Sequence, residues 1–283
     1  MLKVEESFEI CALLFRFAPG TGFDEEVTPF QQSLAEIFGK HANHPAVKYV
    51  KSLEIGLDAV ANFAVHIYKE DGKFYLAHDL TRLIADDRWC DNRPNTLIAL
   101  LNDFYVDTNF GTFFESKADF YKVEADIFIA NQYGKINFDW FAKYIDVCKM
   151  ICIFSPSIQN VNFGATAHGN TYAIVPHNSA IIHELCHAFA NPIGEEWYAT
   201  YDAFRKMCDD TAAMKKIPWY TEGITFAREY TTRAYNILHD YAQGETDLEA
   251  RIAREIDAGG MENTPGCFPY IAQVYAMVVE RES

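Results

Sequence analysis

The sequence predicts a helix-rich α+β protein. Apolar residues recur every three to four positions through much of residues 1–145, which is typical of helices with one buried face. After this region the run KMICIFSPSI is rich in β-branched and aromatic residues and ends at Ser-Pro, which indicates a strand. We therefore expect a mostly helical N-terminal region over residues 1–145. A second region over residues 146–283 should begin with a little β-structure and continue with helices, and the two could form one compact unit.

The first region divides into segments with helical periodicity. They are VTPFQQSLAEIFGKH, HPAVKYVKSLEIGLDAVANFAVHIY, NTLIALLNDFY and SKADFYKVEADIFIANQY. The turn-forming sequences EDGK (70–73) and CDNRPN (90–95) separate them.

The second region is expected to alternate between short strands and long helices. NVNFGATAHGN has the composition of a loop, and TYAIVP that of a short strand, either an ordinary one or an edge strand to which an extended peptide adds. HNSAIIHELCHAFANP has the pattern of a helix that begins near Asn178 or Ser179 and ends at Asn191-Pro192. Further helices are expected in EEWYATYDAFRKMCDDTAAMKK, TEGITFAREYTTRAYNILHDYAQ and CFPYIAQVYAMVVERE.

Composition excludes some partners. The formal net charge is −16, with 40 acidic against 24 basic residues and no basic stripe, so we expect no nucleic-acid ligand. No stretch approaches the roughly 20 apolar residues that cross a bilayer, so we expect no membrane span. The sequence carries no signal for an oligomeric state.

The cysteines and the chain start bear on the compartment. The seven cysteines are odd in number and form no C-x-x-C pair, which is typical of small buried apolar residues in a reducing compartment. The first residues, MLKVEESFEI, are acidic where a signal peptide is basic. If Met1 is the natural start, we expect a cytoplasmic protein.

The segment His183-Glu184-Leu185-Cys186-His187 predicts a zinc site. On a helix His183 and His187 lie one turn apart on the same face, which suits two nitrogen ligands on one zinc ion. Glu184 is rotated by roughly 100° around the helix from His183, so it can reach a water on the metal without binding the metal. The flanking residues are apolar on nearly every side, which indicates a buried helix. We expect one Zn²⁺ per chain, with Glu184 as the general base.

A catalytic zinc needs a third protein ligand, and IPWYTEGITFAREY offers two. Thr221 can cap a helix whose first turn carries Glu222, which is the preferred candidate. Glu229 lies seven residues later, two turns along the same face, and is the alternative third ligand. Four side chains are available as a donor for the oxyanion of a tetrahedral intermediate, and each also fits a purely structural role: Tyr270, Tyr275, His239 and His177.

The segment Pro218-Trp219-Tyr220-Thr221-Glu222-Gly223 resembles the W-x-x-E-G segment of gluzincin metallopeptidases, notably the M1 aminopeptidases. The resemblance implies a zincin-like core in which His183, His187 and Glu222 are ligands and Glu184 is the base. It covers only these two helices, and the 34-residue gap between His187 and Glu222 is longer than in the M1 family.

Over the whole chain the sequence resembles an uncharacterised bacterial family that carries H-E-x-x-H-x-x-x-N-P and a later acidic helix with E-x-x-x-R-A. Here Asn191-Pro192 follows the histidines, and Glu229 with Arg233 and Ala234 fits the second pattern. This resemblance implies a zincin-like fold and favours Glu229.

These observations predict a zinc-dependent hydrolase, a gluzincin-like metallopeptidase that acts on a peptide or protein substrate. One alternative is a catalytically silent zincin-fold protein that binds a partner. Another is a structural metal site in which a fourth ligand, Glu229 or His177, closes the open position.

Overall fold

The computed structural model describes most of the chain. The described residues are 2–18, 28–56, 58–158, 163–166, 172–175, 180–215, 222–258 and 268–283. They form many helices and a small sheet, so the prediction of a helix-rich α+β protein is confirmed.

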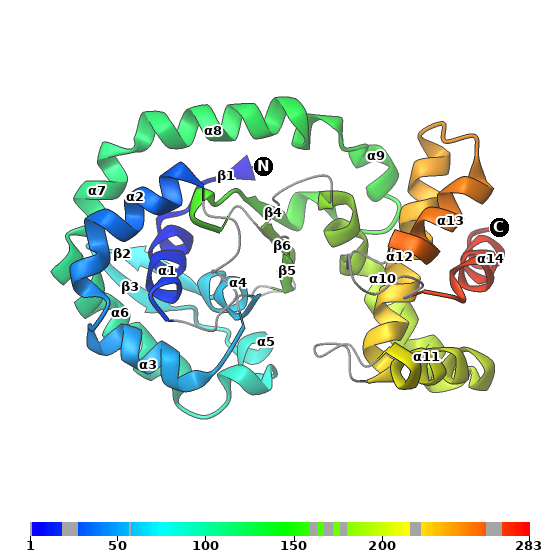
Figure 1. The fold of residues 1–283 in the computed structure, drawn as a ribbon, viewed down its shortest axis with the longest axis horizontal. Helices are drawn as coiled ribbons and strands as arrows, with labels where there is room; N and C mark the ends of the chain where they lie inside the picture. The colour runs from blue at the N-terminus through cyan, green and yellow to red at the C-terminus, as the bar shows by residue number, and fades with distance from the viewer. Residues whose placement is uncertain are drawn as a thin grey trace. The chain divides into compact units, whose positions relative to one another are not determined.

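The chain forms two compact units (Figure 1). The first contains residues 1–137 and 146–184, and the second contains residues 138–145 and 185–283. This division differs from the expected boundary at residue 145, because the small sheet belongs with the N-terminal helices.

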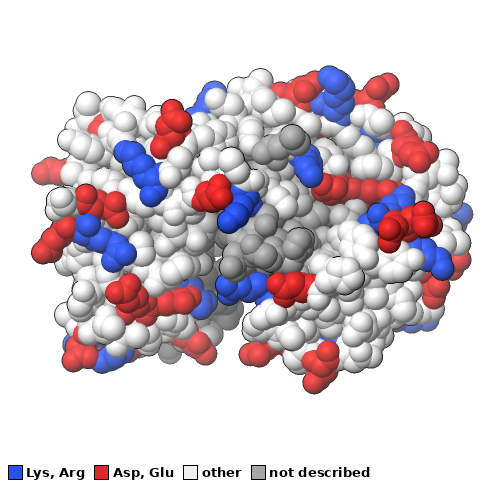
Figure 2. Space-filling model, turned by 180° about the vertical axis from the view of Figure 1, so that it is seen from behind, with Lys and Arg blue, Asp and Glu red and all other residues white. Residues whose placement is uncertain are grey.

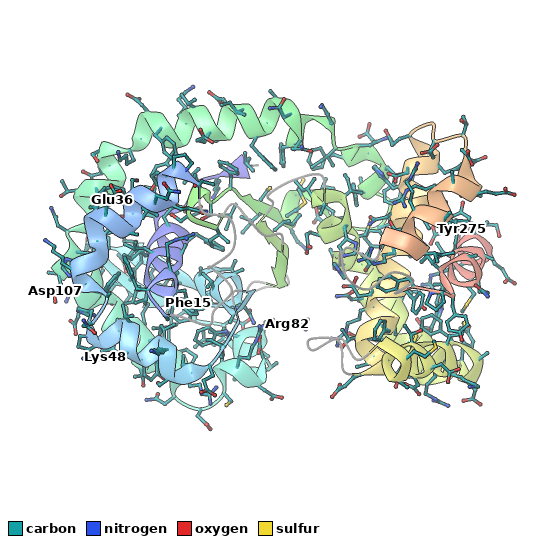
Figure 3. The ribbon with its side chains drawn as sticks, in the orientation of Figure 1. Phe15, Glu36, Lys48, Arg82, Asp107 and Tyr275 are labelled. Carbon is teal, nitrogen blue, oxygen red and sulfur yellow. The ribbon has the colours of Figure 1, made fainter. Side chains whose placement is uncertain are left out.

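The helices of the first unit surround α1. They are α1 (Glu6–Arg16), α2 (Pro29–Phe38), α3 (Pro45–Leu53), α4 (Asp58–Ala64), α5 (Thr81–Ile84), α6 (Arg93–Thr108), α7 (Phe110–Ser116) and α8 (Ala118–Asn131). Residues 10–15 of α1 are completely or almost completely buried, which makes this helix the centre of the apolar core. Figure 3 shows Phe15 inside the unit, whereas Glu36, Lys48 and Asp107 lie at its exposed surface.

The four-stranded sheet has the order β1-β4-β6-β5. The strands are β1 (Leu2–Lys3), β4 (Met150–Ile153), β5 (Phe163–Thr166) and β6 (Tyr172–Val175). β4 pairs in parallel with β1 and β6, and β5 pairs antiparallel with β6. The strands expected in KMICIFSPSI and TYAIVP are therefore present. However, β6 lies between two strands and β5 takes the edge, so the edge-strand hypothesis for TYAIVP is wrong. The loop prediction for NVNFGATAHGN is wrong for residues 163–166, which form β5, and its other residues lie outside the described ranges.

The expected helical segment over residues 44–68 forms α3 and α4, and its last two residues begin a hairpin. β2 (Ile67–Glu70) pairs with β3 (Lys73–Leu76) through a two-residue turn at Asp71-Gly72. Both turn residues have positive φ, 47° and 78°, as the tightest hairpin turns require. The EDGK turn was predicted correctly, but its role was not, because the turn joins two strands.

The helices of the second unit pack around α12. They are α9 (Phe138–Phe141), α10 (Ile181–Thr200), α11 (Asp202–Lys215), α12 (Gly223–Ala242), α13 (Leu248–Ala258) and α14 (Ile271–Glu282), where the first turn of α10 is counted with the first unit. α12 contacts α11, α13 and α14, and many of its side chains are buried, among them Phe226, Tyr230 and Tyr235.

The expected helix end at Asn191-Pro192 is wrong. α10 continues through Pro192 to Thr200, so the segment EEWYATYDAFRKMCDDTAAMKK is split between α10 and α11. A proline inside a helix removes one backbone hydrogen bond and disfavours the helix locally. The turns beyond it are nevertheless buried, since Trp197 is 4% exposed and packs on Phe204 of α11. Tertiary packing therefore overrides the local stop signal.

None of the helices within the described ranges combines the length and apolarity that a membrane-spanning segment needs. The described cysteines are free, and most are buried, namely Cys11, Cys152, Cys186 and Cys208. On the face shown in Figure 2, lysine and arginine side chains are interspersed with aspartate and glutamate.

A carboxyl group is completely buried in the first unit. Glu9 on α1 accepts a hydrogen bond of 2.7 Å from Ser157 Oγ and another from Ser155 Oγ. Burial raises the pKa of Glu9 to about 7, and the hydrogen bonds from Ser155 and Ser157 offset only part of that rise.

This carboxyl group predicts a pH-dependent contribution to stability. The pKa of Glu9 in the folded protein is above its ordinary value of 4.5, so the folded state binds more protons than the unfolded state between about pH 4.5 and 7. Ionisation of Glu9 should therefore lower the free energy of unfolding as the pH rises through this window, by on the order of 3 kcal/mol. Glu9→Gln should be more stable than the wild type at pH 8 and lose this advantage at pH 5, as measured by urea unfolding.

The control is Glu36→Gln, which removes an exposed carboxylate of α2. It should change the free energy of unfolding by a similar small amount at both pH values. If Glu9→Gln also differed from the wild type equally at pH 5 and pH 8, the inferred pKa would be wrong.

Candidate metal centre

α10 carries His183, Glu184 and His187. The first turn of this helix is buried on several sides, since Ile181, Leu185 and Cys186 are at most 2% exposed. His183 and His187 are half-buried, one turn apart on the same helix. The structure therefore supports the helical placement of the motif.

α12 brings a carboxylate to these histidines. Glu229, near the middle of α12, is 7% exposed. One donor atom from each of His183, His187 and Glu229 lies within 4.8 Å of the other two. Within the described part of the chain, these three side chains are the residues grouped closely enough to hold a metal ion.

The orientation of the His187 ring is set by its second nitrogen. Nδ1 lies 2.8 Å from Asn191 Oδ1 and 3.0 Å from Thr232 Oγ1. In the tautomer that carries its proton on Nδ1, this nitrogen donates a hydrogen bond to the amide oxygen of Asn191, which only accepts. The lone pair of that tautomer is on Nε2, which lies 3.4 Å from Glu229 Oε1. This arrangement is the one that metal-ligating histidines adopt.

The separation between His187 and Glu229 fits two ligands of one ion. A direct charge-assisted hydrogen bond between nitrogen and oxygen is about 2.7–2.9 Å long, shorter than the 3.4 Å observed. Two ligands each about 2.1 Å from a tetrahedral zinc lie about 3.4 Å apart. Imidazole nitrogen and carboxylate oxygen are also donors that zinc prefers. The residues present therefore fit a zinc ion.

A glycine allows α10 and α12 to approach closely. A β-carbon at Gly194 would lie 2.5 Å from Thr231 Oγ1 and 2.6 Å from the carbonyl oxygen of Ala227. In addition, Thr231 Oγ1 lies 2.8 Å from the carbonyl oxygen of Ala227 on its own helix, its nearest acceptor, and 3.2 Å from the carbonyl oxygen of Ala190 on α10. These close approaches bring the segment of α12 that carries Glu229 and Thr232 next to the segment of α10 that carries His187.

The structure does not bring Glu222 to the histidines. Glu222 is exposed and is the N-cap residue of α12, and it is not a member of the donor group. Glu222 and Glu229 are separated by two turns, or about 10 Å along the helix axis, so one site cannot use both equally. Among the described residues, the alternative candidate of the sequence analysis, Glu229, therefore lies near the histidines, and the preferred candidate, Glu222, does not. Thr221, expected to cap α12, lies outside the described residues.

The structure places the expected oxyanion donors as follows. His239 is buried, with its ring 5.0 Å from that of Trp140. Tyr270 precedes α14, and its backbone N–H donates to the hydroxyl of Tyr230 at 3.4 Å. Tyr275 is buried on α14 (Figure 3), and burial raises the pKa of its hydroxyl. His177 lies outside the described residues. None of these contacts assigns a catalytic role.

Sequence reasoning missed the residues that support the donor group. Asn191 was interpreted as part of a helix stop, and Thr232 was not considered. Their signal is positional, since Asn191 lies one turn after His187 on the same helix. The signal for Glu229 is an acid in the middle of a helix between the apolar residues Phe226 and Tyr230, where a lone charge would be costly.

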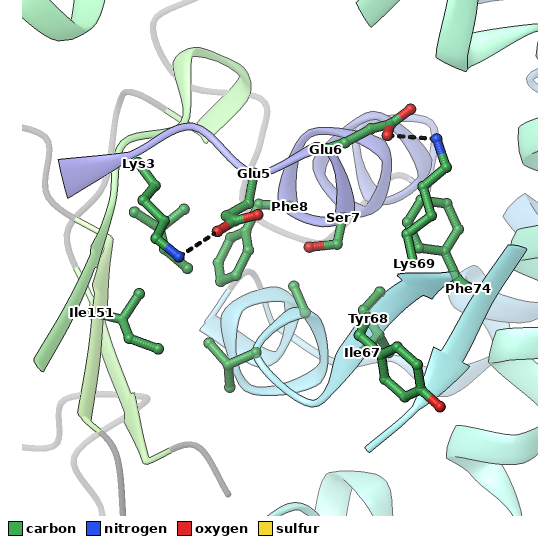
Figure 4. Close-up of a pocket in the computed structure, with 13 residues that line it drawn as sticks. Lys3, Glu5, Glu6, Ser7, Phe8, Ile67, Tyr68, Lys69, Phe74 and Ile151 are labelled. Atoms are coloured by element: carbon green, nitrogen blue, oxygen red, sulfur yellow. Dashed lines mark hydrogen bonds and ion pairs between the residues drawn. The ribbon is translucent and has the colours of Figure 1, made fainter. Parts of the chain in front are cut away.

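A pocket of about 470 Å³ in the first unit contains none of the predicted site residues (Figure 4). Its charged side chains pair with one another. Lys3 contacts Glu5 at 3.4 Å, and Lys69 contacts Glu6 at 2.7 Å. The charged side chains that line this pocket are therefore already paired with one another.

The helix contact at Gly194 yields a prediction. Gly194→Ala should lower the free energy of unfolding by about 1–3 kcal/mol, because the added methyl group meets the backbone of α12. This sign is opposite to the higher helix propensity of alanine. The variant should also bind zinc more weakly, because Glu229 moves with α12. Urea unfolding and competition with a chelator measure the two effects.

Gly39→Ala is the matched control, because a β-carbon there would meet nothing within 4 Å. Gly39 has φ −57°, so alanine fits without strain and should be neutral or slightly stabilising. A Gly194→Ala protein as stable as the Gly39→Ala protein would contradict the close approach of α10 and α12.

Comparison with known proteins adds no family assignment. No protein-family model matches this sequence, and no curated protein and no solved structure shows significant similarity to it. The resemblances to gluzincins and to the uncharacterised bacterial family therefore stay expectations. The chemistry of the candidate centre depends on the side chains described above.

Proposed function

We propose that this protein is a zinc-dependent hydrolase, and specifically a metallopeptidase with a zincin-like core. His183, His187 and Glu229 would hold one zinc ion, and Glu184 would be the general base. The observation that carries the proposal is the orientation of His187. Its Nδ1 is fixed by Asn191 and Thr232, and its Nε2 is turned towards Glu229.

The number of ligands favours catalysis over a structural role. Structural zinc sites have four protein ligands, whereas catalytic sites have three and an open position. Among the described residues the donor group contains three side chains. His177, which was considered as a fourth ligand, lies outside those residues.

Each residue has a role in the proposed reaction. A zinc ion held here would polarise the carbonyl group of the substrate and lower the pKa of a nearby water. Glu184 directly follows His183 on α10 and is 9% exposed. Its carboxylate would take the proton from the attacking water and later donate it to the leaving amine. Asn191 and Thr232 would keep the His187 ring in one tautomer and orientation throughout.

The third ligand can be tested with a matched pair of variants. Wild-type protein should retain about one zinc ion per chain after dialysis, measured by elemental analysis. Glu229→Gln should weaken zinc binding by at least tenfold, because it replaces a charged ligand by a neutral amide. Glu222→Gln, at the exposed start of the same helix, should retain wild-type affinity. Loss of zinc from Glu222→Gln and not from Glu229→Gln would reverse the assignment.

The general base can be tested separately. Glu184→Gln should keep zinc and lose roughly 10²- to 10⁴-fold of its peptidase activity, because the amide cannot accept the proton. Mass spectrometry of a diverse peptide library incubated with the zinc-loaded protein measures cleavage. Glu195→Gln changes an exposed glutamate on the same helix and should leave activity unchanged.

Two results would argue against the proposal. Cleavage by Glu184→Gln at a rate within twofold of the wild type would exclude this residue as the base. A zinc-loaded wild type that cleaves no peptide in the library would favour the alternative, a zincin-fold protein that binds a partner without turnover.

A further inference from the structure

A chain of alternating charges runs from the candidate zinc ligand Glu229 to α13. Arg233 Nε lies 3.4 Å from Glu229 Oε2, and its Nη1 lies 2.8 Å from Glu255 Oε2. Arg251 Nη1 lies 2.8 Å from Glu255 Oε1, and its Nε lies 2.7 Å from Asp240 Oδ2. Glu229, Arg233 and Asp240 belong to α12, whereas Arg251 and Glu255 belong to α13. We call these five residues the charge chain.

Most of the charge chain is shielded from water. The side chains of Glu229, Arg233, Arg251 and Glu255 are 9–14% exposed, and only Asp240 is more accessible, at 37%. Burial alone would raise the pKa of Glu255, but Arg233 and Arg251 outweigh it and hold that pKa below its ordinary value. The carboxylate of Glu255, in the middle of the charge chain, is therefore ionised and paired with two guanidinium groups.

The charge chain has an excess of negative charge. It contains three carboxylates and two guanidinium groups, and both of its ends are carboxylates. At one end, Asp240 is partly exposed to water and lies 3.3 Å from His239 Nδ1. At the other end, Glu229 is buried and faces His187. The two guanidinium groups leave one carboxylate of the charge chain without a matching positive charge, so a cation where the three donors converge would be favoured.

The position of Arg233 is fixed from a second direction. Its guanidinium carbon lies 4.3 Å from the centre of the Phe268 ring. Phe268 is completely buried and packs edge-on against Tyr230, one turn from Arg233 on α12. A flat guanidinium group can stack on this ring while bonding to a carboxylate at its edge, which an ammonium group cannot do.

We propose that Arg233 is a positioning residue that holds Glu229 towards the two histidines. Because Arg233 also forms an ion pair with Glu255 of α13, zinc binding is coupled to the docking of α13 on α12. This inference rests on the proposed zinc site. It adds a residue, Arg233, that supports the site without being a ligand, and it assigns a role to α13. By thermodynamic linkage, zinc should stabilise the docked α13 by the same factor by which the docked α13 strengthens zinc binding.

The first test compares zinc affinities by competition with a chromogenic chelator. Arg233→Met and Glu255→Gln should each weaken zinc binding by about 10- to 100-fold, as changes behind metal ligands do. Arg233→Lys should recover part of the loss, because it keeps the charge but not the stacked fork. In the cobalt-loaded protein, Arg233→Met should also shift the visible absorption bands, because Glu229 is a ligand whose orientation changes.

Arg254→Met is the matched control. Arg254 also lies on α13 and forms an ion pair of 2.8 Å with Glu245, but it is 58% exposed and not part of the charge chain. Its affinity for zinc should stay within twofold of the wild type. A folded Arg233→Met protein that also binds zinc within twofold of the wild type would overturn the inference.

The second test needs no variant. Hydrogen exchange of the wild type, measured by mass spectrometry with and without zinc, should show slower exchange in residues 248–258 of α13 on zinc binding. The slowing should exceed that in residues 202–215 of α11, which also packs on α12 but has no residue in the charge chain. Equal slowing in the two helices would overturn the coupling.

The outcomes separate this inference from the proposed function. Tight zinc binding that is insensitive to Arg233 and Glu255 would leave the metal site standing and remove the coupling. Coupled zinc binding without peptide cleavage would leave the coupling standing and remove the peptidase. A wild type that binds no zinc would overturn both.

Discussion

The candidate site depends on the close packing of α10 against α12. These helices meet at Gly194, where even a β-carbon would collide with the backbone of α12. The hydroxyl of Thr231 also lies 3.2 Å from the carbonyl oxygen of Ala190 at the same place. With the two backbones this close, side chains in the middle of α12 reach the histidines of α10. Two regular helices therefore determine the position of every proposed ligand.

A second constraint is that the carboxylate of Glu229 is buried next to this helix contact. A carboxylate that leaves water must be matched by hydrogen bonds and positive charge. Glu229 has Arg233 behind it and His187 in front of it, at 3.4 Å in each case. Both distances are long for direct hydrogen bonds, and on the histidine side the spacing accommodates a bound cation. The same side chain thus links the site to the charge chain on α13.

Two glutamates that are shielded from water have pKa values shifted in opposite directions. Glu9 is surrounded by hydroxyl groups of Ser155 and Ser157 and has no cation among these partners, so burial raises its pKa and favours the protonated form. Glu255, whose side chain is 12% exposed, lies between two guanidinium groups, which hold its pKa below its ordinary value and keep it ionised. The difference shows how neighbouring groups decide the charge state of an acid that is shielded from water.

The sequence by itself determined the helix-rich α+β class, the strands β4 and β6, the helix that carries His183 and His187, and the two acids considered as a third ligand. These features follow from local periodicity, because residues three or four apart on a helix share a face wherever the helix packs. Only the tertiary structure brought Glu229 rather than Glu222 to the two histidines, carried α10 through Pro192 and placed β5 at the sheet edge. Each of these depends on contacts between segments far apart in the chain. The packing of α12 on α10 buries Glu229 and leaves Glu222 exposed, and no local pattern encodes that contact.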